Sequence, residues 1–176
     1  MPKTTLKKMQ TTRDWLGLRA VRIKPEQRKF TTLLMLSYMQ SSHQAITMYG
    51  VYLDDIAIGY VMLIQADNPS QWIIERLTID RDHQRQGYGY DVVDQLIDQV
   101  YELEDSEMVV ARYDKDNIAA RDLFAKLKFE ERDKSTRGRK IAVLKFEFED
   151  VDEDEKTDDD TDASSSATDE IDSTDS

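Results

Sequence analysis

One stretch of the chain constrains its fold more than any other. Residues 71–80 (QWIIERLTID) carry apolar side chains on both alternating faces, so this strand should lie inside a sheet that is covered on both sides. Strand patterns also cover residues 16–23, 46–53, 56–65, 108–113 and 139–148. Helical patterns follow Pro25, follow the glycines near residue 88, and cover residues 117–127. The order of elements predicts an α/β layered domain with a mixed sheet.

Charge divides the chain into a body and a tail. Residues 149–176 contain 14 acidic residues and one lysine, a net of −13, whereas the whole chain carries −12, which leaves +1 for residues 1–148. The acidic stretch has too few apolar side chains to offset its ordering entropy. We therefore expect a flexible basic arm over residues 1–14, a folded domain over 15–149 and a disordered acidic tail over 150–176. An alternative is that the tail covers a basic patch. The patch would comprise Arg132, Lys134, Arg137, Arg139 and Lys140.

Composition excludes several kinds of chemistry. The chain has no cysteine, so disulfides, thiolate zinc sites and cysteine nucleophiles are excluded. Its two histidines, His43 and His83, lack the spacing of metal ligands, so we expect no metal. No apolar run approaches the roughly 20 residues that span a bilayer, which favours a cytoplasmic protein without a membrane partner. The basic run near the N-terminus is too short to indicate a nucleic-acid partner.

The most informative motif lies between the apolar strand and the next helix. Residues 80–90 read DRDHQRQGYGY, and Val92, Val93, Leu96, Ile97 and Val100 form the apolar stripe of the helix that follows. Gly87 and Gly89 permit a tight turn with no Cβ to obstruct a ligand. The N–H groups at the start of the helix suit a phosphate. The motif lacks the GK[ST] of a Walker loop and the third glycine of a dinucleotide fingerprint.

Two segments together resemble a known family. Gln84-Arg85-Gln86-Gly87-Tyr88-Gly89 resembles the acyl-CoA pyrophosphate loop of the GCN5-related N-acetyltransferase (GNAT) superfamily. Residues 117–124 (NIAARDLF), followed by Lys126-Leu127-Lys128-Phe129, resemble the family segment N-x-x-A-x-x-L-Y-x-x-x-G-F. The resemblance covers residues 16–148. It implies an α/β (α+β) fold with a mixed, mainly antiparallel central sheet flanked by helices.

The resemblance also implies a donor and its binding residues. Acetyl-CoA would be the acyl donor, and no metal would be needed. Backbone groups of Leu77, Thr78 and Ile79 would hold the pantetheine and help to stabilise the oxyanion. The other residues expected to bind acetyl-CoA are Gln84, Arg85, Gln86, Gly87, Tyr88, Gly89, Asn117 and Phe124. Because dimers are common in the family, the resemblance points to a homodimer.

Glu75 is the candidate catalytic base. An amine with a pKa near 10.4 must lose a proton before it attacks a thioester, and a carboxylate in an apolar strand can accept it. Glu75 lies nine residues before Gln84, a spacing that resembles the diamine and polyamine acetyltransferases. We expect acetyl transfer to the primary amine of a small molecule, with a diamine or polyamine as the finer hypothesis. Acetylation of a protein or peptide, and a non-catalytic acyl-CoA-binding module, are the alternatives. Glu75 could instead be a cross-strand partner for a lysine or arginine.

Two positions depart from the family pattern. Phe124 stands where many members carry a tyrosine that protonates the leaving thiolate, and Lys128 replaces the usual glycine before Phe129. The thiolate then leaves unaided or through water, or another hydroxyl such as that of Tyr113 or Tyr88 protonates it.

Overall fold

The computed structural model describes residues 3–30, 45–136 and 138–148. Its sheet has seven strands in the order β1-β2-β3-β4-β5-β7-β6, and only the β4–β5 pair is parallel. The strands are β1 (Thr5–Lys8), β2 (Ile46–Leu53), β3 (Ile56–Gln65), β4 (Gln71–Ile79), β5 (Met108–Asp114), β6 (Glu130–Thr136) and β7 (Arg139–Lys145). The helices are α1 (Thr12–Gly17), α3 (Tyr88–Tyr101), α4 (Ile118–Lys126) and two 3₁₀ helices, Leu18–Ala20 and Pro25–Phe30. The expected α/β fold with a mainly antiparallel sheet is confirmed.

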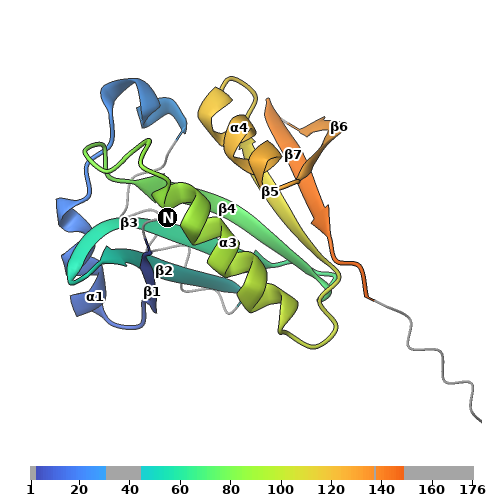
Figure 1. Cartoon of the computed structure of the whole chain (residues 1–176), viewed down its shortest axis with the longest axis horizontal. Coiled ribbons are helices and arrows are strands. Elements are labelled where there is room, and N and C mark those ends of the chain that lie inside the picture. The colour runs from blue at the N-terminus through green and yellow to red at the C-terminus, as the bar shows by residue number, and fades with distance from the viewer. Residues whose placement is uncertain (1–2, 31–44, 137, 149–176) are drawn as a thin grey trace, which may run out of the picture.

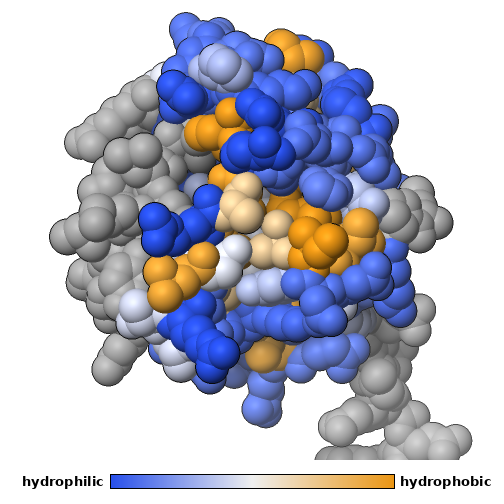
Figure 2. Space-filling view, turned by 90° about the vertical axis from the view of Figure 1, so that its left-hand side faces the viewer, coloured by the Kyte–Doolittle hydropathy of each residue, from blue (hydrophilic) through white to orange (hydrophobic). Residues whose placement is uncertain are grey.

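Both faces of the sheet are covered, as the apolar sequence of β4 predicts. On one face α3 crosses the sheet (Figure 1) and buries Val92, Val93, Leu96 and Val100 against it. On the other face a smaller cluster forms around Trp15 and Leu18. It comprises Met9, Trp15, Leu18, Met48, Tyr60 and Met62. Seen from the side of α1, the surface is mostly hydrophilic, with apolar side chains gathered near its middle (Figure 2).

The strand expected over residues 16–23 is wrong. Residues of this stretch belong to α1 and to the 3₁₀ helix Leu18–Ala20. A capping box starts α1: the Thr11 side chain accepts the Asp14 N–H, and the Asp14 side chain accepts the Thr11 N–H. Trp15 and Leu18 are then buried at helical spacing, whereas Leu16 is 55% exposed.

The flexible arm expected over residues 1–14 is also wrong where the structure describes it. Residues Thr5–Lys8 form the edge strand β1, and Leu6 pairs with Val51 of β2. The side chain of Asp91 accepts hydrogen bonds from the Thr4 N–H and hydroxyl at 2.6 Å each, which ties this strand to α3. Polar residues predominate in β1 because an edge strand of this length has little surface to bury.

The other expected elements agree with the structure or lie beyond it. The strands of the predicted 46–53 and 56–65 hairpin pair antiparallel, and helices occupy the predicted positions after Gly87 and Asn117. The helix expected after Pro25 is a 3₁₀ helix as far as Phe30, and residues 31–44 lie outside the described residues. The acidic tail and Arg137 of the basic patch lie outside them too. In the described part of the chain, no helix is long and apolar enough to cross a membrane.

Candidate active site

The sheet opens between β4 and β5. Their parallel pairing runs from Gln71↔Met108 to Ile74↔Ala111 and then stops. On the other side of β4, Ile74 pairs with Leu63 and Arg76 with Met62, so Glu75 is an extra residue in a β-bulge. A bulge bends its strand and increases the local twist. β4 therefore turns away from β5 at Glu75, and no described strand pairs with that edge of β4 beyond Ile74.

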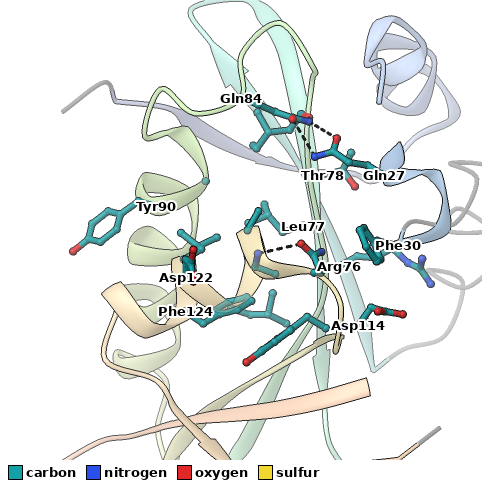
Figure 3. Close-up of a pocket in the computed structure, with 18 of the residues that line it drawn as sticks. Gln27, Phe30, Arg76, Leu77, Thr78, Gln84, Tyr90, Asp114, Asp122 and Phe124 are labelled. Carbon is teal, nitrogen blue, oxygen red and sulfur yellow. Dashed lines mark hydrogen bonds between the residues drawn. The ribbon is translucent and has the colours of Figure 1, made fainter. Parts of the chain in front are cut away.

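A cleft of about 1020 Å³ lies at this opening. That volume is at the upper end of the range for small-molecule sites, about 300–1,000 Å³. Figure 3 shows Gln27 and Gln84 joined by hydrogen bonds at one end of the cleft, with Asp114 near the other. All but one of the site residues expected from the sequence line the cleft. They are Glu75, Leu77, Thr78, Ile79, Gln84, Arg85, Gln86, Gly87, Gly89, Asn117 and Phe124. The exception is Tyr88, which is buried in the main core.

The loop before α3 is held in a shape that exposes the helix N-terminus. Arg85 and Gly87 both adopt left-handed backbone conformations, with φ of 63° and 91°. The Gln84 amide donates to the Ile79 carbonyl at 2.9 Å, which fixes the loop to the end of β4. The first i→i−4 hydrogen bond of α3 runs from the Asp91 N–H to the Gly87 carbonyl at 3.1 Å. The N–H groups of Tyr88 and Gly89 precede that bond, and N–H groups at such a helix end suit an anion.

Asp80 anchors the same loop to the N-terminal segment. Its carboxylate accepts the Arg22 N–H at 2.6 Å and the Asp82 N–H at 2.9 Å, and it faces the His83 ring at 3.5 Å. Burial alone would raise the pKa of Asp80, but these hydrogen bonds and the charge of Arg22 outweigh it and lower the pKa. The ionised carboxylate thus holds residues 80–83 against the chain that leads to Gln27.

The first turn of α4 forms another wall of the cleft. The Asn117 side chain caps α4 by accepting the Ala120 N–H at 3.1 Å. Phe124, which is 4% exposed, stacks on Tyr113 with ring centroids 5.7 Å apart. The Tyr113 hydroxyl donates to Glu131 at 2.8 Å. Burial raises the pKa of Tyr113. This hydrogen bond and the charge of Glu131 raise it further, to about 12.

Glu75 lies between two arginines at the opening of the sheet. The Arg139 Nη1 donates to Glu75 Oε1 at 2.6 Å, and the Arg112 Nη1 lies 3.7 Å from Oε2. The cross-strand partner that the sequence left as an alternative is thus present. Oε2 is buried and accepts no hydrogen bond from the described residues. The role of Glu75 as a base stays a prediction.

Sequence reasoning missed the residues that reach the cleft from distant strands. Arg112 lies on β5 and Arg139 on the neighbouring strand β7, where it pairs with Asp114 of β5. Gln27 comes from the 3₁₀ helix and bonds to Gln84 at 2.8 Å and 3.1 Å. An isolated arginine in a strand pattern carries no local signal of such a position. The described residues contain no group of three or more His, Asp or Glu side chains placed to hold a metal ion.

The comparisons with known proteins agree with this geometry. The model of the acetyltransferase (GNAT) family matches residues 10–129. No curated protein matches the chain. An acetyltransferase from Thermus thermophilus superposes with a TM-score of 0.69 at 16% identity, covering 82% of this chain and 97% of that one. An aminoglycoside acetyltransferase in complex with coenzyme A superposes with a TM-score of 0.69 at 19% identity, covering 81% of this chain and 95% of that one.

A third solved structure is the ribosomal-protein-S18-alanine N-acetyltransferase from Escherichia coli. It has a TM-score of 0.64 and 17% identity, covering 84% of this chain and 98% of that one. At these identities the solved structures show the shared fold, and the family model, which spans more than half of the chain, shows the family. The chain therefore belongs to the acetyltransferase (GNAT) family, as an N-acetyltransferase that uses acetyl-CoA.

Proposed function

We propose that the protein transfers the acetyl group of acetyl-CoA to the primary amine of a small molecule. The observation that carries the proposal is one continuous cleft. It runs from the anion-binding loop at the start of α3 to the opening between β4 and β5, where Glu75 lies. An acyl transferase needs these two ends: one for the phosphates of the donor, and one where an amine meets the thioester.

The donor end of the cleft suits coenzyme A. The N–H groups at the start of α3 would bind the pyrophosphate, and Gly89 keeps the approach open because it has no Cβ. Arg85 and Lys126 add positive charge to the cleft wall. The edge of β4 beyond Ile74 would hold the pantetheine through backbone groups of residues 77–79. Backbone N–H groups there would also stabilise the oxyanion that develops on the thioester carbonyl.

The chemical step needs a proton acceptor. The ammonium of the acceptor loses one proton, its nitrogen attacks the thioester carbonyl carbon, a C–N bond forms and the C–S bond breaks. The nitrogen then loses a second proton, which passes through water to the departing thiolate. We assign the first proton to Glu75, directly or through one water. Oε1 accepts a hydrogen bond from Arg139, and Oε2 accepts none from the described residues. The ion pair with Arg139 keeps Glu75 in place beside the opening of the sheet.

The departing thiolate has no tyrosine beside it at position 124. Tyr88 is buried in the core, so it cannot substitute. Tyr113 lines the cleft, but its hydroxyl proton is directed to Glu131, and a pKa of about 12 keeps the proton on the oxygen. We propose that the thiolate leaves without a dedicated protein acid, which the modest pKa of a thiol, about 8.5, allows.

Diamines and polyamines are the finer hypothesis for the acceptor. The positive charges of Arg76, Arg112 and Arg139 line the cleft near the carboxylate of Glu75. A second ammonium group would meet these charges, so the acceptor end disfavours a polycation. We therefore keep the acceptor as the primary amine of a small molecule and let the test include diamines.

Release of coenzyme A from acetyl-CoA tests the proposal. A thiol-reactive dye reports it without background, because the protein has no cysteine. Amino acids, diamines, polyamines and peptides form the acceptor panel. We expect turnover with one class and a loss of at least tenfold in kcat for Glu75→Gln. The matched control is Glu130→Gln, because Glu130 is an exposed glutamate paired with Arg132 on β6 and does not line the cleft.

A second reading is a module that binds acyl-CoA without catalysis, and Phe124 is the observation that favours it. Calorimetry separates the two readings. If acetyl-CoA binds, the panel gives no turnover and Phe124→Tyr does not restore it, the module is supported over the enzyme. Acetylation of peptides but not of small amines would instead support the peptide alternative.

A further inference from the structure

We infer that the acceptor is an amine that also carries a carboxylate, and that Arg112 and Arg139 recognise this group. The inference rests on the proposed acetyl transfer and names the substrate class of the same site. Its starting point is the end of the cleft away from the α3 loop, where the two arginines flank Glu75.

The two guanidinium groups are more exposed than the carboxylate between them. The side chains of Arg112 and Arg139 are 42% and 41% exposed, and that of Glu75 is 14% exposed. Both arginines line the cleft, so part of each side chain is within reach of a ligand that enters it. Glu75 thus holds the arginines from the buried side and leaves their outer donors to a ligand.

Strand geometry puts these arginines on the face opposite α4. Ala111 and Tyr113 belong to the main core, under α3 and α4, and side chains alternate along a strand. Arg112 and Asp114 of β5 therefore point to the other face. Arg139 shares that face because it pairs with Asp114. The arginines approach the opening from the side opposite the helices that would hold coenzyme A.

Charge at this end of the cleft is unbalanced. Figure 3 shows Phe30, Arg76 and Asp114 across the cleft from Tyr90 and Asp122. This end of the cleft is lined by β4 near the bulge, β5, β7 and the end of the 3₁₀ helix. Among the described residues of these elements that line it, four are cationic and two are carboxylates, a net charge of +2. The cationic residues are Lys29, Arg76, Arg112 and Arg139, and the carboxylates are Glu75 and Asp114. The sequence of residues 31–44, which follows the 3₁₀ helix, contains neither Asp nor Glu.

A carboxylate fits these donors better than other groups do. Arg112 Nη1 lies 3.7 Å from Glu75 Oε2, beyond hydrogen-bond distance, so the planar fork of Arg112 is not consumed by Glu75. Arg139 uses one of its five N–H donors on Oε1. Arginine forks bind a carboxylate through two parallel hydrogen bonds. With its carboxylate held there, the acceptor would present its amine to the opening of the sheet beside Glu75.

Acceptors that differ in one group test the inference. Each pair consists of an amino acid and its amide, at three lengths: glycine and glycinamide, 4-aminobutanoate and 4-aminobutanamide, and glycylglycine and its amide. We expect the carboxylate member of the preferred pair to have a kcat/KM at least tenfold higher. Arg112→Gln should reduce that preference at least fivefold through KM, with acetyl-CoA affinity unchanged. Arg132→Gln, which removes an arginine outside the cleft, should leave the preference intact.

The outcomes distinguish this inference from the proposed function. Turnover of amides or of 1,4-diaminobutane at rates equal to or above those of the carboxylates would overturn the inference while leaving the acetyltransferase intact. If nothing is turned over, thermal stabilisation of the protein with bound coenzyme A decides. If the carboxylates stabilise the protein, the amides do not, and Arg112→Gln abolishes the stabilisation, the anion site is supported. If both kinds of compound stabilise the protein equally, or neither does, the anion site is refuted.

Discussion

Asp80→Asn should destabilise the protein by about 1.5–3 kcal/mol at neutral pH. In the native protein the two carboxylate oxygens accept separate backbone N–H groups, Arg22 at 2.6 Å and Asp82 at 2.9 Å. Asparagine has one oxygen, so one of these N–H groups would face an amide NH₂. A hydrogen bond to a charged group contributes about 1.5–3 kcal/mol, and a buried donor left unpaired costs a similar amount. At about 2–4 °C per kcal/mol for a domain of this size, the melting temperature should fall by about 3–12 °C.

The effect should depend on pH in a defined direction. The pKa of Asp80 is lowered in the folded protein, so its stabilisation is fully present above the unfolded value of about 3.9. This stabilisation is lost as the pH falls through the lower pKa that Asp80 has in the folded protein. Urea unfolding of wild type and Asp80→Asn between pH 8 and pH 3 measures the difference. A gap below 0.5 kcal/mol at pH 7, or one that does not shrink below about pH 4, would refute this account of the anchor.

Three further substitutions test other parts of the structure. Lys128→Gly should raise stability by about 1 kcal/mol in urea unfolding, since φ at Lys128 is 63°; no gain would contradict the assigned backbone strain. Gly59→Ala should cost about 1–3 kcal/mol in the same assay, because its Cβ would lie 2.3 Å from the Thr78 carbonyl oxygen; a neutral result would mean that β3 and β4 are not this close. Tyr113→Phe should lower kcat for coenzyme A release less than threefold, whereas a tenfold loss would show that Tyr113 protonates the thiolate.

Sequence patterns succeeded where burial follows a single local period. In α3 the stripe residues Val92, Val93, Leu96 and Val100 are buried, and in the two-faced apolar run of β4 Ile73 and Ile74 are buried. The prediction failed at residues 16–23 because an alternating strand pattern places Leu16 and Leu18 on the same face. Leu18 is fully buried and Leu16 is 55% exposed, since the helix that begins after Thr11 puts Trp15 and Leu18 on one side. β1 was missed because Leu6 is its one apolar residue.

The residues of the candidate site could likewise be predicted where they depend on the local chain and not where they depend on distant strands. Gly87 and Gly89 could be found because their function depends on the local chain: a turn, and then the N-terminus of a helix. Glu75 was selected by spacing, but its bulge depends on the register between β3 and β4. Arg112 and Arg139 meet Glu75 only because β5 and β7 pair as they do. Such contacts between distant strands leave no periodic signal in the sequence.

Detection of the acetylated amine by mass spectrometry tests the central claim most directly. Wild-type protein is incubated with isotope-labelled acetyl-CoA and the acceptor panel, and labelled product is compared with released coenzyme A. We predict one labelled N-acetyl group for each coenzyme A released, with at least tenfold less of both products in Glu75→Gln. Coenzyme A release without a labelled amine, or bound acetyl-CoA with no product from any acceptor, would contradict acetyl transfer by this cleft.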